Sequence, residues 1–309
     1  MRLILTFLIL LTARVLLAQC CSGGVPMSSN LGMPSADRGT FQFDISYDLN
    51  NLQTLKQGTN TLNDDTRERQ THSVLLKFGY SFNDKFSVDG FVSYVRQERT
   101  ISTLAEEDFT STNGVGDGVV MLKYSPIEGL TSGYGIKVPL GKSDIGNLNA
   151  DLQPGSGAWD QIFYLSYTGQ FKFRPSLTYF GTSIYRLTGV NKTYFVDSQY
   201  EFGDEFQILG GISDRFLIGN VIIDPSLKLR YRHAGRDRFD NGNFPGSGGS
   251  FVFMSPAISW RISPVLNYHI SAELPIYARV KETQLSPTFR INTGIGYTIK
   301  PKKLNTIKI

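Results

Sequence analysis

Phe41-Gln-Phe-Asp-Ile-Ser-Tyr-Asp-Leu49 is a stretch in which apolar and polar side chains alternate strictly. The same period of two returns from Phe289 to Ile299, near the end of the chain. Successive side chains of a β-strand point to opposite faces, so both stretches predict strands with one apolar and one polar face. A soluble sheet would bury the apolar face in a core, whereas a membrane barrel would turn it outward to lipid.

About twelve segments of this kind are found along the chain. They cover 39–49, 71–80, 85–97, 115–124, 130–140, 158–167, 171–186, 205–213, 216–232, 250–260, 265–277 and 287–299. The short connectors between them are 81–84, 125–129, 168–170, 214–215 and 261–264. The long connectors are 50–70, 98–114, 141–157, 187–204, 233–249 and 278–286.

Short and long connectors alternate, as in outer-membrane barrels with short periplasmic turns and long extracellular loops. The sequence therefore predicts an all-β fold, an antiparallel transmembrane β-barrel of about 12 strands over 39–299. The alternative is an exported soluble β-sandwich or lipocalin-like barrel. Such a fold has no reason to sort its loops by length.

The N-terminus has the features of an export signal. Met1-Arg2 gives a positive start, and an apolar run follows that is shorter than a membrane span. We expect a signal peptide over 1–18, a mobile leader over 19–38 and a basic C-terminal tail over 300–309. The predicted location is the cell outer membrane.

Only two cysteines occur, and they are adjacent at Cys20 and Cys21. Such a pair cannot staple distant parts of a fold, so no disulfide framework is expected. Lipid attachment at Cys20 is an alternative, but Gln19 stands where lipoprotein signals usually carry a small residue.

The charge balance excludes some partners. The chain carries 31 Lys and Arg against 27 Asp and Glu, with no basic patch interleaved with aromatic residues. We therefore expect no nucleic-acid partner. The expected partners are outer-membrane lipid, the barrel assembly machinery and small apolar solutes, while the oligomeric state stays open.

Enzymatic chemistry finds little support. The histidines are His72, His233 and His269, and they lack the spacing of a zinc site. His72 has outward parity at the outer rim, where a barrel phospholipase would act, but no serine can be placed beside it. Because a nucleophile and base cannot be assembled, we predict no enzyme, no cofactor and no metal.

Parity assigns a set of charges to the interior. A turn centred near Asn83 would put Lys77 opposite Asp89, and the next turn would put Asp117 opposite Lys137. The further inward candidates are Asp44, Lys123, Asp160, Arg174, Lys228, Arg230, Arg232, Asn267, His269, Glu273 and Arg290. Interior ion pairs can be scaffold alone. The alternative is that Lys228, Arg230 and Arg232 line a route for acidic solutes.

Three motifs follow one another in the middle of the chain. They are Gly114-Val-Gly116-Asp117 with Lys123-Tyr124, Gly135-Ile-Lys137-Val-Pro139-Leu-Gly141-Lys-Ser-Asp144, and Leu152-Gln-Pro-Gly-Ser-Gly157-Ala-Trp-Asp160. Over about 114–167 the chain resembles the exported barrel proteins named after the meta-pathway of phenol degradation. The basic tail departs from barrels that end on a strand-terminal aromatic residue.

The resemblance implies an outer-membrane barrel that passes hydrophobic or aromatic small molecules. It adds weight to Asp117, Lys137 and Asp160, and it makes loop 141–157 a candidate plug that folds inward. A barrel of this size should have a narrow or plugged lumen. We therefore expect passive uptake of small hydrophobic or aromatic molecules. The alternative is a non-transporting structural or adhesive barrel that displays loops 50–70, 98–114 and 233–249.

Overall fold

The structure is a computed structural model that describes residues 37–103, 106–146, 148–195, 198–219 and 221–300. The predicted signal peptide, nearly all of the leader with Cys20 and Cys21, and the tail beyond Lys300 lie outside the described residues. In the part described, no helix has the length and apolar character needed to cross a membrane.

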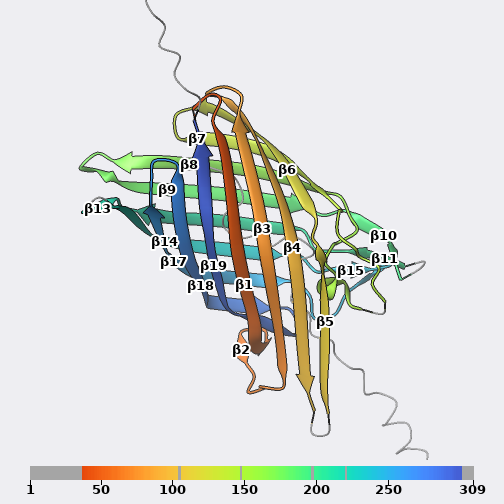
Figure 1. Ribbon diagram of the computed structural model, residues 1–309. Coiled ribbons are helices and arrows are strands. Elements are labelled where there is room, and N and C mark those ends of the chain that lie inside the picture. The colour runs from red at the N-terminus through yellow and green to blue at the C-terminus, as the bar shows by residue number, and fades with distance from the viewer. Residues whose placement is uncertain (1–36, 104–105, 147, 196–197, 220, 301–309) are drawn as a thin grey trace, which may run out of the picture.

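Twelve long strands form a closed antiparallel barrel (Figure 1). They are β1 (Phe41–Gln57), β3 (Arg67–Ser81), β4 (Phe86–Ser102), β6 (Gly118–Ile127), β7 (Leu130–Val138), β8 (Asp160–Phe171), β9 (Arg174–Leu187), β12 (Glu205–Ser213), β14 (Val221–Ala234), β17 (Gly249–Arg261), β18 (Leu266–Val280) and β19 (Thr283–Ile299). Each pairs with its neighbours in this order, and the pairing of β1 with β19 closes the ring. The predicted fold class and strand number are confirmed.

Shorter elements decorate the two ends. They are β2 (Asn60–Thr61), β5 (Glu107–Val115), β10 (Val190–Tyr194), β11 (Ser198–Glu201), β13 (Phe216–Ile218), β15 (Arg238–Phe239), β16 (Gly242–Asn243) and the 3₁₀ turn η1 (Ala150–Leu152). Strands β1, β3, β4 and β5 extend far into connectors predicted as loops. For example, β4 and β5 pair with each other from Tyr94–Val115 to Ser102–Glu107. We refer to the end with the tight turns as the short-turn end and to the other as the long-loop end. Short turns face the periplasm in outer-membrane barrels.

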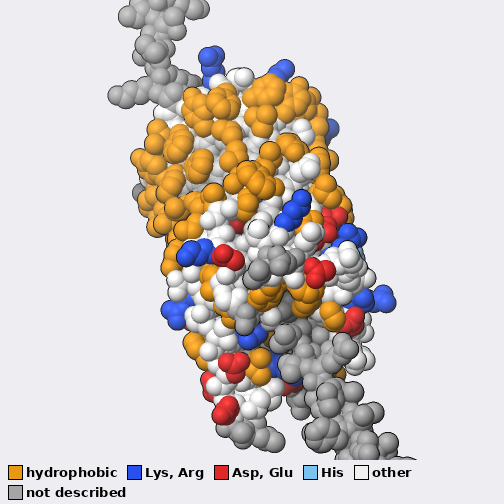
Figure 2. Space-filling view, turned by 90° about the vertical axis from the view of Figure 1, so that its right-hand side faces the viewer, with side chains coloured by type: hydrophobic (Ala, Val, Ile, Leu, Met, Phe, Trp, Pro, Cys, Tyr) orange, Lys and Arg blue, Asp and Glu red, His pale blue; other side chains and the backbone are white. Residues whose placement is uncertain are grey.

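The outer surface changes character along the barrel axis. Ile45, Leu76 and Val92 lie side by side on β1, β3 and β4 and point outward. Figure 2 shows hydrophobic side chains over the upper part of the surface, at the short-turn end, and charged side chains lower down. An apolar band of this kind is what lipid-facing strands require.

The interior reverses this pattern toward the long-loop end. On β1 the inward residues Asp44, Ser46 and Asp48 are polar, but beyond a register shift at Asn51/Leu52 the buried positions include Leu52 and Leu55. A bulge moves side chains to the other face of a strand. The barrel is therefore polar inside and apolar outside within the band, and beyond it part of the interior wall becomes apolar.

One predicted turn is wrong. Asp214-Arg215 was expected to join two strands directly, yet Ser213 of β12 pairs with Ser226 of β14. The apolar residues between them form an extra hairpin, in which Phe216 pairs with Ile223 and Ile218 with Val221. Gly219 takes a positive φ of 62° at its tip, a conformation that glycine adopts without strain.

Candidate functional site

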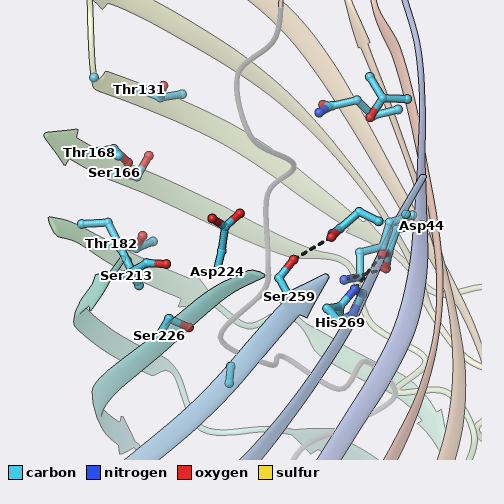
Figure 3. Close-up of a pocket in the computed structure, with 18 of the residues that line it drawn as sticks. Asp44, Thr131, Ser166, Thr168, Thr182, Ser213, Asp224, Ser226, Ser259 and His269 are labelled. Atoms are coloured by element: carbon cyan, nitrogen blue, oxygen red, sulfur yellow. Dashed lines mark hydrogen bonds and ion pairs between the residues drawn. The ribbon is translucent and has the colours of Figure 1, made fainter. Parts of the chain in front are cut away.

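A cavity of about 1200 Å³ occupies the barrel from the short-turn end inward. It reaches the turns at Asp84, Lys85 and Glu128, and Figure 3 shows hydroxyl groups from several strands around it. The polar residues labelled there are Asp44, Thr131, Ser166, Thr168, Thr182, Ser213, Asp224, Ser226, Ser259 and His269. The short-turn half of the barrel is thus a water-accessible chamber.

The chamber has a less polar wall as well. Tyr164 of β8, Phe180 of β9 and Leu209 of β12 line it on adjoining strands. On the long-loop side of Tyr164 lies a buried cluster of Val119, Met121, Ile162 and Ile184, against which Phe91 and Tyr164 pack. Polar and apolar surfaces therefore face each other across one space.

Ion pairs run around the interior from strand to strand. Lys137 of β7 lies 2.7 Å from Asp160 and 3.3 Å from Asp117. The other interior pairs are Asp44–Lys77 (3.1 Å), Asp89–Lys123 (2.8 Å), Asp160–Arg186 (3.9 Å), Glu205–Arg186 (3.6 Å), Glu205–Arg232 (2.7 Å), Glu273–Arg230 (2.5 Å) and Asp48–Arg290 (2.8 Å). Opposite charges on neighbouring strands satisfy each other where water is scarce.

The predicted partner of Lys77 is wrong. Asp89 lies opposite Gly79, and Lys77 lies opposite Phe91 on β4 and opposite Asp44 on β1. Ser81 lies opposite Ser87, so the ladder is centred on Asp84 and not on Asn83. The Asn83 side chain accepts hydrogen bonds from the backbone N–H groups of Lys85 and Phe86 in this turn. This offset moves the ladder by two residues, so Asp89 pairs with Lys123 of β6 instead.

The ion pair predicted between Asp117 and Lys137 is present, but the two residues are not opposite each other in a ladder. Lys137 lies opposite Val119, and Asp117 sits at the bend between β5 and β6. All eleven predicted lumen candidates, Asp117, Lys137, Asp160, Lys77, Asp89, Lys123, Lys228, Arg230, His269, Glu273 and Arg290, lie on the inward face. Arg174 does not, because it pairs with Asp214 in an exposed position at the short-turn end.

Loop 141–157 folds into the barrel. Residues 150–156 are all buried, and η1 forms part of this stretch. Asp117 accepts hydrogen bonds from the backbone N–H (3.0 Å) and the hydroxyl (2.6 Å) of Ser156. Lys137 donates to the same Ser156 hydroxyl. The charges of the first and second sequence motifs, Asp117 and Lys137, therefore hold Ser156 of the third motif, and with it the loop, against the wall.

Further contacts fix the loop to β3, β4 and β5. Arg69 donates to the Asp151 carboxylate at 2.5 Å and to its backbone carbonyl. Gln97 donates to the carbonyl of Gln153 at 2.9 Å, and Thr112 donates to that of Leu152 at 2.5 Å. The inward fold of this loop agrees with the sequence-based expectation of a plug.

A small sheet covers the loop from the long-loop end. Strands β10, β11, β15 and β16 pair in that order to form this outer cap (Figure 1). Its core contains Tyr194, Tyr200 and Phe202 packed against Ala150 of η1. The Tyr194 hydroxyl donates to the carbonyl of Leu148 at 3.3 Å, and burial raises the pKa of Tyr194 to about 12.

A second apolar cluster closes the opposite side of the long-loop end. It consists of Leu52, Leu55, Phe251, Phe253, Ala278, Val280 and Leu285. The rings of Phe251 and Phe253 stack at 6.0 Å, and Arg230 lies 4.3 Å over the Phe253 ring. The chamber is therefore closed toward the long loops and extends to the short turns.

Sequence reasoning missed several residues of this arrangement. Arg69, Arg186 and Glu205 belong to the ion-pair network, and Ser156 anchors the loop. Ser156 stands inside the third motif, which was the available signal. The aromatic residues of the outer cap had no such sequence signal, because strands β11 and β15 are far apart in the sequence and too short to show an alternation of apolar and polar residues. No group of three metal-binding side chains occurs among the residues that the structure describes.

No family model and no curated protein matches the sequence. Among solved structures, the chain is similar to an outer-membrane channel from Pseudomonas putida F1, with a TM-score of 0.66 and 13% identity over 87% of this chain and 97% of that one. It is also similar to the β domain of the Bordetella autotransporter BrkA, with a TM-score of 0.51 and 11% identity over 84% and 100% of the two chains. At these identities the likeness establishes the architecture. The chain has the fold of an outer-membrane β-barrel.

Proposed function

We propose that the protein is an outer-membrane channel for the passive uptake of small molecules with a hydrophobic or aromatic body. The observation that carries this proposal is the chamber, closed on the outer side by loop 141–157. A barrel that served only as scaffold would gain by filling this space, because close packing stabilises an interior. The similar barrel from Pseudomonas putida F1 is described as a channel, in agreement with this view.

The closure has the properties of a movable part. Loop 141–157 adds no strand to the barrel wall and is tied by separate hydrogen bonds to Arg69, Gln97, Thr112 and Asp117. Its withdrawal would break these bonds and leave every ladder of the barrel intact. Each such bond contributes only about 0.5–3 kcal/mol net.

The mixed lining of the chamber favours small molecules that have an apolar body. Tyr164, Phe180 and Leu209 offer contact area to a ring or chain, and hydroxyl groups such as those of Ser226 and Thr182 offer hydrogen bonds. A purely polar solute would leave the apolar wall in contact with water, which is unfavourable. We infer an outer-membrane location for the protein on the same grounds.

A reversible cross-link tests the channel. A Cβ built at Gly114 of β5 would lie 3.3 Å from the Cβ of Pro154 in the loop, close to the separation found in disulfides. The variant Gly114→Cys/Pro154→Cys, with Cys20 and Cys21 replaced by Ser, would lock the loop to the wall when oxidised. We expect flux of a permanently charged aromatic solute such as benzenesulfonate, which crosses a bare bilayer slowly, into proteoliposomes to stop under oxidation and to return on reduction.

The Cys20→Ser/Cys21→Ser variant without the engineered pair is the control, and its solute flux should be the same under oxidising and reducing conditions. Equal flux through the oxidised and reduced cross-link variant would show that the route bypasses the loop. A folded barrel that passes no solute even when the cross-link is reduced would contradict the channel itself.

A structural or adhesive barrel is the second candidate function. The paired strands β4 and β5 project from the barrel at the long-loop end, as a displayed hairpin would (Figure 1). If display of this hairpin is the function, replacing its tip with a short turn should abolish binding of the partner. If transport is the function, the same replacement should leave solute flux unchanged.

A further inference from the structure

The interior of the barrel contains one buried basic side chain that takes part in no ion pair among the described residues. Eight buried carboxylates lie within the barrel or on loop 141–157, and each makes an ion pair with a base. They are Asp44, Asp48, Asp89, Asp117, Asp151, Asp160, Glu205 and Glu273. The bases facing them are Arg69, Lys77, Lys123, Lys137, Arg186, Arg230, Arg232 and Arg290, and Lys228 is a ninth. Among the described residues, no ion pair or hydrogen bond engages the Lys228 ammonium.

Lys228 is only 9% exposed, and its side chain lines the chamber. The acid whose charge acts on Lys228 is Glu273, which Arg230 already holds with two hydrogen bonds of 2.5 and 2.9 Å. Asp44 is likewise held by Lys77, and its other oxygen lies 3.6 Å from His269. An ammonium with so little access to water needs a counter-charge. Glu273 acts on Lys228 only from beyond ion-pair distance, and none of the described carboxylates forms an ion pair with it.

An aromatic ring stands beside the aliphatic stem of Lys228. Gly211 of β12 lies opposite Lys228 of β14 on one side and opposite Phe180 of β9 on the other. A Cβ at Gly211 would lie 2.6 Å from Cζ of Phe180 and 3.0 Å from Cγ of Lys228. The missing side chain at Gly211 therefore lets the ring and the lysine stem approach each other across the intervening strand.

The remaining surroundings suit an anion with a ring. Ser226 is two residues from Lys228 on the same inward face, and Thr182 and Leu209 line adjoining strands (Figure 3 labels Ser226 and Thr182). The nearby acid Asp224 is engaged by Arg215 at 2.9 Å and Arg261 at 3.6 Å. The described carboxylates of the cavity without an ion pair, Asp84 and Glu128, lie at the turns of its mouth.

We propose that Lys228 and Phe180 form a binding subsite for small aromatic carboxylates of about the size of benzoate. The carboxylate pairs with the Lys228 ammonium and accepts a hydrogen bond from Ser226, while the ring packs on Phe180 and Leu209. This subsite rests on the proposed function, because it selects among the molecules that the channel admits. A neutral hydrocarbon would leave the ammonium without a counter-charge and is held less tightly.

Binding to the full-length protein, refolded in detergent, tests the subsite directly. Benzoate, benzyl alcohol and benzylamine share a ring and differ in charge, so their dissociation constants isolate the ammonium. We expect benzoate to bind at least about tenfold more tightly than the other two, since a charge-assisted hydrogen bond is worth that much or more. Equal binding of all three ligands by the wild-type protein would overturn the proposal.

Variants assign the effect to the two residues. Lys228→Gln should weaken benzoate binding by about tenfold and leave benzyl alcohol unchanged, whereas Lys228→Arg should retain most of the preference for the acid. Phe180→Leu should weaken all ring ligands. Lys172→Gln, which removes a charge from an exposed turn at the same end, is the matched control. Heat-dependent migration on gels confirms that each variant forms a barrel.

Flux into proteoliposomes separates this proposal from the function on which it depends. Flux of benzenesulfonate through the wild-type barrel, with no effect of Lys228→Gln on the binding of benzoate, would leave a channel without the subsite. Binding of benzoate through Lys228 with no flux of any solute would retain the subsite and contradict the channel.

Discussion

Lys137 shows how one residue links the barrel wall to its closure. Its ammonium group is 2% exposed and serves two carboxylates, Asp117 and Asp160, at 3.3 and 2.7 Å. It also donates to the Ser156 hydroxyl of the inward loop. Buried charges are tolerated only when they are paired and hydrogen-bonded, so the three groups depend on one another.

The substitution Lys137→Met is expected to lower the free energy of unfolding by about 3–5 kcal/mol, because it leaves two buried carboxylates without their shared cation. Urea unfolding of the barrel in phospholipid vesicles measures the change. Lys172→Met, on an exposed turn, should have little effect. Adding Asp160→Asn to Lys137→Met should recover part of the loss. A cost below about 1 kcal/mol for Lys137→Met would show that water reaches these groups.

At the scale of the element, each long strand carries two different environments. On β3, Leu76 points outward between Ile45 of β1 and Val92 of β4. Along the outward face of β3 it lies between Tyr80 and Val74. Farther along the outward face of β4, the side chains become Arg96, Glu98 and Thr100. We expect the strands to leave the lipid at the boundary between these stretches.

Arginine at the two heights should therefore have different effects. Leu76→Arg is expected to lower the free energy of unfolding in vesicles by about 2–4 kcal/mol, the cost of a charge on the lipid face near the bilayer midplane. Thr100→Arg lies beyond the apolar band, opposite Glu68, and should change stability little. Similar costs at both positions would argue that the outward face of the barrel does not contact lipid.

The alternation that predicts these strands also explains where prediction stopped. A local period of two assigns the strand at Phe41–Leu49 and the inward direction of Lys228. It does not fix the register of a turn, so the partner of Lys77 was misplaced by two residues. The pairing of Tyr200 with Phe239 in the outer cap joins residues far apart in sequence, for which no local signal exists. That Lys228 has no ion pair or hydrogen bond within the described part of the chain follows only once all its neighbours there have been placed.

At the scale of the whole molecule, the barrel is closed at one end and hollow at the other. The apolar cluster around Phe251, the outer cap and loop 141–157 fill the long-loop end. The chamber extends to the short turns, and Ser226 lies on its wall. A molecule arriving from the short-turn side meets the chamber directly, whereas one from the other side must first displace the loop.

This asymmetry predicts one-sided chemical access. With Cys20 and Cys21 replaced by Ser, the variant Ser226→Cys in oriented proteoliposomes should react with a charged, membrane-impermeant thiol reagent added on the short-turn side. The same reagent on the long-loop side should react slowly, because the loop and cap lie in its path. Thr59→Cys, exposed between β1 and β2, should show the opposite preference.

Breaking the contacts of the loop by Gln97→Ala and Thr112→Ala should speed labelling of Ser226→Cys from the long-loop side, since these side chains hold Gln153 and Leu152 in place. Equal labelling from both sides before this change would mean that the loop does not close the channel.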